Sequence, residues 1–364
     1  MRVLMTVDAV GGVWGYALEL AQGLTAEGVE VHLAAMGPAP TAGQVRELAR
    51  SDAAGFRHGA FALEWEDDPW SDVERAGEWL LETAAALSPD LVHLNGYAHG
   101  ALPFDAPVLV AGHSCVLSWH AAVRGRAPGR EADPYRRAVR TGIRSAAALV
   151  APTAAMLREL ERLYHPSCDC FVIPNGRDPA AFSPRAKEPF VAGSGRLWDE
   201  AKNLDALDRA AAAIDWPVLL AGDGGGCSCR AARLLGRLSA REVAALIARA
   251  SVFAAPARYE PFGLAALEAG LSGCALVLGD IASLREVWGD AATFVPPDDP
   301  DALAAALQHL IASPGAVREA GGMARERALR YDRSTMAHAY ARLYAELGRR
   351  APPPRPAALP AVPA

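Results

Sequence analysis

Short apolar runs recur along most of this chain, and amphipathic stretches with helical spacing separate them. Runs of only a few residues without apolar–polar alternation favour strands that are buried on both faces. Strands that alternate with helices are typical of β-α-β units and of a parallel sheet. The pattern therefore predicts an α/β protein with Rossmann-like, doubly wound parallel sheets. In such sheets ligands bind beyond the carboxyl ends of the strands.

The first half of the chain begins with the clearest unit of this kind. The run 3–7 is followed by Gly11-Gly12, then by apolar residues at helical spacing from about Trp14 to Glu27, and Gly28 ends the helix. Further buried strands are predicted at 29–35, 91–94, 108–111 and 148–151.

The pattern restarts near residues 165–175, with strands predicted at 171–173, 190–193, 218–221, 252–255 and 275–278. At about 150 residues per domain, the length of 364 residues accommodates two domains. We predict an N-terminal domain over 1–168 and a C-terminal domain over 169–333, with a helix at 334–349 that follows them. The Pro- and Ala-rich residues 350–364 are expected to be disordered.

Composition narrows the class of protein. The net charge of −6 does not predict a basic face for duplex nucleic acid. The apolar run at the N-terminus is too short for a signal peptide, and no stretch of about 18 apolar residues predicts a spanning helix, so we expect a cytoplasmic protein. The cysteines form the pairs Cys168/Cys170 and Cys227/Cys229, with Cys115 and Cys274 alone. Zinc sites usually have two residues between paired cysteines, so we expect thiols and no metal.

The most informative segment runs from Glu260 to Glu268, with Gly263 at the start of a predicted helix at 262–271. A helix N-terminus offers unpaired N–H groups and partial positive charge to an anion, and glycine lets a phosphate approach closely. Glu268 lies about 7–8 Å along the helix axis from this end. The two carboxylates would flank a bound pyrophosphate and accept hydrogen bonds from sugar hydroxyls.

The alternative is that Glu260 caps the helix and that Glu268 is simply exposed. The apolar neighbours of Glu268 favour a buried position, where a carboxylate without a partner is costly.

A second anion signal lies at Gly193-Ser194-Gly195-Arg196 and continues to Lys202. Arg196 follows a predicted strand and Lys202 precedes the next helix, so both cations could neutralise a diphosphate leaving group. Taken alone, this segment is better explained as an ordinary solvated loop. Beside Glu260 and Glu268 it favours a nucleotide-sugar site.

These motifs, in this order and spacing, resemble glycosyltransferase family 4, a group of retaining enzymes with the GT-B fold. The resemblance covers roughly residues 1–330. It rests on Glu260 and Glu268 eight positions apart, on Gly195-Arg196 with Lys202, and on Pro174-Asn175-Gly176 and Gly222-Asp223-Gly224. It implies two Rossmann-like domains that face a central cleft, with the acceptor on the N-terminal side and the nucleotide-sugar donor on the C-terminal side. It also implies that the helix at 334–349 crosses back to the N-terminal domain.

The resemblance also implies residue roles. Arg196 and Lys202 would bind the donor diphosphate with the backbone N–H groups of Gly263 and Leu264, next to Phe262. Glu268 would hold the ribose, and Glu260 the donor sugar. No metal would be required, because the cations and the helix end do its work.

In the first half, His113 follows the strand 108–111 and resembles the family's active-site histidine, which contacts the donor sugar. His93 lies within an apolar strand and is interpreted as structural. Gly11 and Gly12 resemble the glycine-rich loop that faces the donor phosphates; a simple tight turn accounts for them equally well. They do not match a dinucleotide fingerprint, which disfavours an oxidoreductase.

One segment departs from the family pattern. Only residues 225–235 separate Gly222-Asp223-Gly224 from the next glycine, so the helix that the family has there must be shortened or missing. Because the resemblance places the nucleotide base near this segment, the base is not specified.

The sequence thus predicts a retaining glycosyltransferase that moves a sugar from a nucleoside-diphosphate sugar to an acceptor hydroxyl. A nucleotide-sugar epimerase or hydrolase, or a non-catalytic nucleotide-binding homologue, are the alternatives. The acceptor is unspecified; loops at 37–75 and 114–135 are where its pocket is expected. A modest basic cluster could meet a lipid-linked acceptor, although a solvated face is the better explanation: Arg124, Arg126, Arg130, Arg136 and Arg137.

Overall fold

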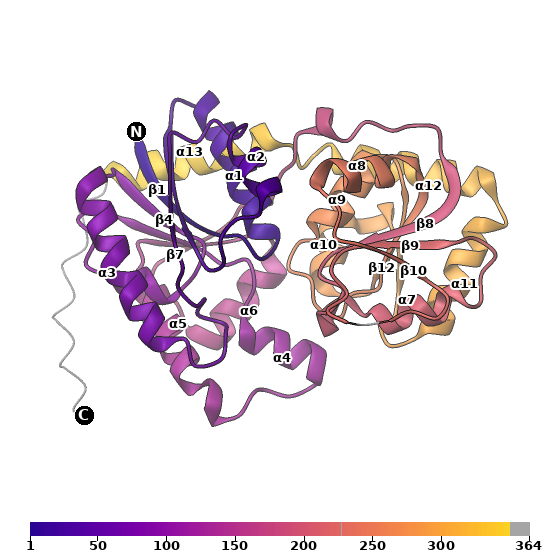
Figure 1. Cartoon of the computed structure of the whole chain (residues 1–364), viewed down its shortest axis with the longest axis horizontal. Coiled ribbons are helices and arrows are strands. Elements are labelled where there is room, and N and C mark those ends of the chain that lie inside the picture. The colour runs from indigo at the N-terminus through magenta and orange to yellow at the C-terminus, as the bar shows by residue number, and fades with distance from the viewer. Residues whose placement is uncertain (227, 350–364) are drawn as a thin grey trace. The chain divides into compact units, whose positions relative to one another are not determined.

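The computed structural model describes residues 1–226 and 228–349, and its contacts divide the chain into two units. Unit 1 comprises Met1–Ser118, Ala127–Ile173 and the chain from Met336 on; unit 2 comprises Trp119–Arg126 and Pro174–Thr335. Cys227 lies outside the described residues, and so does the tail at 350–364. The expected disorder of that tail is therefore untested. Each unit contains one parallel sheet (Figure 1), which confirms the predicted α/β class.

Unit 1 is built on a seven-stranded sheet with the order β3-β2-β1-β4-β5-β6-β7. Its central strands consist almost wholly of buried aliphatic residues, as a parallel sheet covered on both faces requires. The strands are β1 Arg2–Asp8, β2 Glu30–Met36, β3 Gly55–Gly59, β4 Leu91–Leu94, β5 Val108–Ala111, β6 Ala148–Ala151 and β7 Asp169–Val172.

Helices cover this sheet. The side chains of Val92, Val110 and Leu149 from three strands share one core cluster with residues of α3, α5 and α6. The α-helices that begin in unit 1 are α1 Gly12–Ala26, α2 Ala42–Leu48, α3 Trp70–Leu87, α4 Val116–Arg124, α5 Asp133–Ser145 and α6 Ala154–Tyr164. Two short 3-10 helices, η1 (Ala98–Ala101) and η2 (Arg130–Ala132), lie between them.

The last described helix, α13 (Arg333–Arg349), belongs to unit 1 from Met336 on and lies beside α1 (Figure 1). The Tyr344 hydroxyl lies 2.6 Å from Nδ1 of the buried His93, and the Tyr340 ring stacks on the same imidazole. His93 is therefore structural, as the sequence predicts: it ties helix α13 to strand β4.

Unit 2 is built on a six-stranded parallel sheet with the order β10-β9-β8-β11-β12-β13. Neighbouring residues of β11 serve opposite faces: Phe253 packs in one core cluster with α9 and α12, and Val252 packs in another with α7 and α11. The strands are β8 Glu188–Ser194, β9 Val218–Ala221, β10 Arg233–Gly236, β11 Ala250–Ala255, β12 Ala275–Gly279 and β13 Thr293–Val295. The helices are η3 Pro179–Ala181, η4 Glu200–Lys202, α7 Leu204–Ala211, α8 Ala240–Arg249, α9 Leu264–Leu271, α10 Ala282–Trp288, η5 Gly289–Ala291, α11 Pro300–Ile311 and α12 Pro314–Ala328.

One assignment from the sequence is wrong. The strand expected to open the second domain, β7, pairs in parallel with β6 and is the last strand of the first sheet. The division between the units follows Ile173 instead of residue 168. The short run 171–173 has no feature that distinguishes the end of one sheet from the start of the next. Pro174, which cannot donate a ladder hydrogen bond, stands two residues after Val172, the last residue of the strand.

The strand order reverses once in each sheet, between β1 and β4 in unit 1 and between β8 and β11 in unit 2. Connections leave the two neighbouring strands in opposite directions at such a point, and the crevice beyond their carboxyl ends is where doubly wound sheets bind ligands. None of the described helices has the length and apolar character needed to cross a membrane.

Candidate active site

The reversal point of unit 2 opens into a cavity at the start of α9. Its walls come from the ends of β8 and β11 and from the loop that leads into the helix, and they include Ser194, Lys202, Glu260 and Gly263. The cavity encloses about 460 Å³, part of it open to solvent. Three of the residues singled out from the sequence, Lys202, Glu260 and Gly263, are thus brought together.

Gly263 is the N-cap of α9 and has a φ of +92°, in the left-handed region that favours glycine. A Cβ at this position would lie 3.1 Å from Cδ2 of Leu284 and 3.4 Å from Cγ of Glu260. The glycine therefore keeps the start of the helix open towards the cavity. Leu264 is the first residue of α9, two residues later than the predicted start.

Lys202 and Glu260 form an ion pair across the cavity wall. The Lys202 ammonium donates to Oε2 of Glu260 at 2.5 Å, and the two side chains are 24% and 21% exposed. Ser283 donates its hydroxyl to the Glu260 carbonyl oxygen, which fixes the loop that carries the carboxylate. The alternative that Glu260 caps α9 with its side chain is not observed, because α9 has no side-chain cap.

Asn203 holds Lys202 in place from the next position. Its φ is +59°, and its buried amide donates to the carbonyl oxygens of Pro256 at 3.0 Å and Pro297 at 2.6 Å. The end of η4 is thereby tied to the loop after β11. The sequence placed Asn203 beside the predicted cations but gave it no role; its left-handed backbone and long-range contacts become visible only in the fold.

Glu268 lies further along α9, outside the cavity lining, and pairs with Arg177. The Arg177 Nε donates to Oε1 of Glu268 at 2.9 Å, and the two side chains are 11% and 16% exposed. The backbone of Arg177 is held in turn by Tyr331 and Arg333. The sequence predicts that Glu268 is buried, and the structure confirms that it is largely so, but reasoning from the sequence missed its partner. The only signal was that Arg177 directly follows Pro174-Asn175-Gly176.

Arg196 is held apart from the cavity by Asp199. Its Nη2 donates to Oδ2 of Asp199 at 3.2 Å, and its guanidinium lies over the Trp198 ring, 5.6 Å from the centroid. The other Asp199 oxygen accepts from Trp119 Nε1 at 3.0 Å. Arg196 is 39% exposed and is not part of the cavity lining.

The glycine motifs of unit 2 serve close backbone packing. A Cβ on Gly222 would lie 1.9 Å from the Gly195 carbonyl oxygen, and one on Gly176 would lie 2.3 Å from that of Asp332. Between β9 and β10 the described residues form no helix, which confirms the shortened segment. Asp208 holds this segment by accepting from the backbone N–H groups of Arg230, Ala231 and Ala232. Phe262 is 2% exposed and packs edge-on against Tyr331, so its side chain belongs to the core.

In unit 1, His113 lies just beyond β5, half-buried, with its ring 4.3 Å from that of Tyr16 between centroids. Its Nε2 lies 2.8 Å from Oδ1 of Asn95, whose amide donates through Nδ2 to the Thr6 carbonyl oxygen at 2.7 Å. A carbonyl oxygen can only accept, so Asn95 turns its own oxygen towards His113, and His113 donates from Nε2. Burial lowers the pKa of His113 to about 4, so the ring is neutral near pH 7.

Gly11 is the N-cap of α1, with an extended φ of −144°, and Gly12 is the first residue of that helix. His113 and this loop both lie beyond the carboxyl ends of unit 1 strands, as predicted. Their contact with a donor remains a prediction.

The free thiols include Cys115, Cys168, Cys170, Cys229 and Cys274, and within the described residues no group of His, Cys, Asp and Glu is arranged to hold a metal ion. Burial raises the pKa of the Cys274 thiol to about 11 and that of Cys168 to about 12.

Comparison with known proteins identifies the family. The model of Glycosyltransferase Family 4 matches residues 10–181, and that of Glycosyl transferases group 1 matches residues 188–313. A curated relative, glycogen synthase of Mycobacterium tuberculosis, is 30% identical over 98% of this chain and 97% of its own length.

Solved structures agree on the fold. Sucrose-phosphate synthase from Thermosynechococcus elongatus superposes with a TM-score of 0.78 at 20% identity, covering 95% of this chain and 99% of that one. HepE of Anabaena, solved in complex with UDP-glucose, gives a TM-score of 0.75 at 18% identity and covers 95% of this chain and 100% of its own. With its two parallel-sheet units and these matches, the chain belongs to glycosyltransferase family 4 and is a glycosyltransferase of the GT-B fold.

Proposed function

We propose that this glycosyltransferase takes a sugar from a nucleoside-diphosphate sugar and transfers it to an acceptor hydroxyl with retention of the anomeric configuration. The observation that carries the proposal is the cavity at the start of α9, where Lys202, Glu260 and Gly263 meet. A cation beside an open helix N-terminus suits a diphosphate, because both favour negative charge. The neighbour solved with UDP-glucose supports the same class of donor.

The Lys202–Glu260 pair suggests how the site receives its donor. In the structure each charge neutralises the other, so neither is left partly buried without a partner. The diphosphate would take over the contact with Lys202. Glu260 would then be released to accept hydrogen bonds from the hydroxyls of the donor sugar.

In the transfer step the bond from the anomeric carbon to the diphosphate oxygen breaks and a bond to the acceptor oxygen forms on the same face. The acceptor proton passes to the departing diphosphate. Lys202 and the N–H groups of Gly263 and Leu264 would stabilise the charge that develops on this leaving group, and Arg196 would add to it after release from Asp199. Arg177 would keep Glu268 oriented for the ribose.

These cations and the helix end are proposed to replace a metal ion. Transfer is therefore expected to continue at an unchanged rate in excess EDTA, measured on protein that has been dialysed against the chelator. Loss of activity that added Mg²⁺ or Mn²⁺ restores would contradict this part of the proposal.

The proposal is tested by a panel of nucleotide sugars. The donor that raises the melting temperature most is then incubated with candidate acceptors, and proton NMR reads the anomeric configuration of the product. Retained configuration in a transferred sugar supports the proposal. Release of free sugar alone would instead indicate a hydrolase, and an epimerised donor would indicate an epimerase. If no donor binds, the protein would be non-catalytic.

A further inference from the structure

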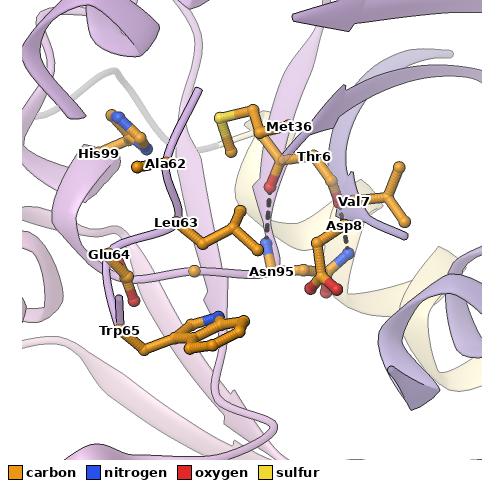
Figure 2. Close-up of a pocket in the computed structure, with 11 residues that line it drawn as sticks. Thr6, Val7, Asp8, Met36, Ala62, Leu63, Glu64, Trp65, Asn95 and His99 are labelled. Atoms are coloured by element: carbon orange, nitrogen blue, oxygen red, sulfur yellow. Dashed lines mark hydrogen bonds between the residues drawn. The ribbon is translucent and has the colours of Figure 1, made fainter. Parts of the chain in front are cut away.

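A second cavity lies at the reversal point of the unit 1 sheet. Its residues come from the end of β1, from the turn after β4 and from the segment 62–65, and the space of about 470 Å³ is partly open to solvent. Figure 2 shows Leu63, Glu64 and Trp65 on one side and Thr6, Asp8 and Asn95 on the other. The full lining is Thr6, Val7, Asp8, Met36, Ala62, Leu63, Glu64, Trp65, Asn95, Gly96 and His99.

The charged residues of this lining are all acidic. Asp8 and Glu64 contribute carboxyl groups, and the lining contains no lysine or arginine. His99 adds no positive charge, because burial lowers its pKa and its Nε2 donates to the Val73 carbonyl oxygen at 2.9 Å. An anionic ligand would therefore enter without a countercharge, while hydroxyl groups would find acceptors.

Glu64 also occupies backbone donors that could otherwise attract a phosphate to this lining. Its oxygens accept from the N–H groups of Tyr97 and Ala98, at 2.7 to 3.1 Å, where the short helix η1 begins. Burial raises the pKa of Glu64, and these backbone donors offset part of that rise. A ligand phosphate at this place would have to displace the protein's own carboxylate.

Trp65 supplies the apolar surface. Its side chain is 43% exposed, whereas Trp14 in the same unit is 3% exposed and buried in the core. Ligand pockets are lined mainly by hydrophobic and aromatic side chains together with a few polar groups, and Trp65 supplies an aromatic ring of this kind. An indole beside carboxylates matches the apolar C–H face and the polar hydroxyl rim of a sugar ring.

We propose that this cavity binds the acceptor as an uncharged saccharide or polyol and discriminates against phosphorylated acceptors. The ring would lie against Trp65, and Asp8 would accept from its hydroxyls. Asp8 is held for this task by the Val10 N–H at 2.9 Å. The inference rests on the proposed function, because it names the chemical class of the acceptor.

Binding is measured first without donor. Saturation-transfer NMR compares glucose with glucose 6-phosphate, myo-inositol with myo-inositol 1-phosphate, and maltotriose as an oligosaccharide probe. At least one uncharged probe is expected to bind tenfold or more tightly than its phosphorylated counterpart. Equal or tighter binding of the phosphorylated partner, or no binding of any uncharged probe, overturns the inference.

Variants then locate the site. Trp65→Ala is expected to weaken binding of the uncharged probe at least fivefold, and Trp65→Tyr to restore most of it. Asp8→Asn is expected to reduce the difference in affinity between the uncharged probe and its phosphorylated counterpart. Asp67 is an exposed neighbour outside the lining, so Asp67→Asn is the matched control. It should change neither the affinity for the uncharged probe nor the difference from its phosphorylated counterpart. Unchanged binding in Trp65→Ala would contradict this placement.

Transfer assays separate this inference from the proposed function. If no nucleotide sugar binds or reacts, the proposed function fails, while the donor-free measurements still decide the chemistry of this cavity. If a donor reacts and the sugar passes only to phosphorylated acceptors, the function stands and the inference fails.

Discussion

At the scale of single residues, Lys202 stands out because it and Lys187 are the only lysines in the chain; the other basic residues are arginines. An ammonium is a compact charge on a flexible stem, whereas a guanidinium is a planar fork that prefers two-point contacts. A lysine at the wall of a narrow cavity can therefore exchange its ion pair with a carboxylate for a contact with a diphosphate.

Replacing the charges of this pair tests their part in catalysis. Lys202→Ala and Glu260→Ala are each expected to lower kcat/KM for the donor by a hundredfold or more, or about 3 kcal/mol of transition-state stabilisation. Lys202→Arg should recover only part of the loss. Arg249→Ala, which removes an exposed charge paired with Glu188 in the same unit, is the control. Near-normal rates in well-folded Lys202→Ala protein would remove the proposed role.

The Arg177–Glu268 pair is expected to stabilise unit 2 as well as to orient Glu268. Breaking a largely buried pair leaves one charge without its partner, so Arg177→Met should reduce the free energy of unfolding by about 2–4 kcal/mol. The double variant with Glu268→Gln should regain part of this loss, which urea titration can measure. A change below about 0.5 kcal/mol in the single variant would show that the pair is not structural.

The neutral histidines of unit 1 predict sensitivity to acid. Burial lowers the pKa of His93 to about 3 and that of His113 to about 4, from an ordinary value near 6.5. The unfolded chain therefore binds more protons below pH 6.5, and stability that is fully present above this pH is lost as the pH falls towards 4. Each histidine contributes a slope of about 1.4 kcal/mol per pH unit in this window.

The measurement is the unfolding midpoint in urea between pH 7.5 and pH 4.5. His93→Gln should show a smaller decline than the unaltered protein, and His309→Gln, at an exposed position, should show the same decline. An equal decline in all three would assign the acid sensitivity to other groups.

At the scale of elements, the sequence identifies interior strands and misses edges. The strands β1, β4, β5 and β6 consist mostly of buried aliphatic residues, and their predicted positions are confirmed. β3, β10 and β13, which were not predicted, are edge strands, and β7, which was assigned to the wrong domain, is the fourth edge. An edge strand is covered by a neighbour on one side only and needs fewer apolar residues, so its signal is weak; β3, for example, reads Gly-Phe-Arg-His-Gly.

The start of α9 offers a test of an element boundary. Gly263→Ala would place a methyl group against Leu284 and Glu260 at a positive φ, so it should cost about 1–2 kcal/mol of stability and weaken donor binding about tenfold. Gly28→Ala has a similar φ of +75° with no atom within 4 Å, and so shares the backbone strain without the crowding. Calorimetric titration with the nucleoside diphosphate compares the affinities of the Gly263→Ala and Gly28→Ala variants. Equal affinity in both would show that the diphosphate does not approach Gly263.

At the scale of the whole molecule, alternation of strands and helices was sufficient to predict two doubly wound units, because neighbouring parallel strands need a long crossover connection, which is usually a helix. The connection between β9 and β10, whose described residues form no helix, is an exception. The alternation did not predict the lining of the unit 1 cavity. Glu64 and Trp65 lie in a segment without regular periodicity, and their neighbours, such as the Tyr97 N–H, are distant in the sequence. The partner of Glu268 was missed for the same reason. Long-range pairs of charged and polar groups leave no local pattern in one sequence.

The two reversal points present contrasting chemistry: a lysine and an open helix N-terminus in unit 2, and carboxylates with an exposed indole in unit 1. The most direct test of the proposed donor site is a crystal structure of the protein with its bound nucleotide-sugar donor. We expect diphosphate oxygens within hydrogen-bond distance of the Lys202 ammonium and of the N–H groups of Gly263 and Leu264. A diphosphate bound elsewhere, with the Lys202–Glu260 pair intact, would contradict it.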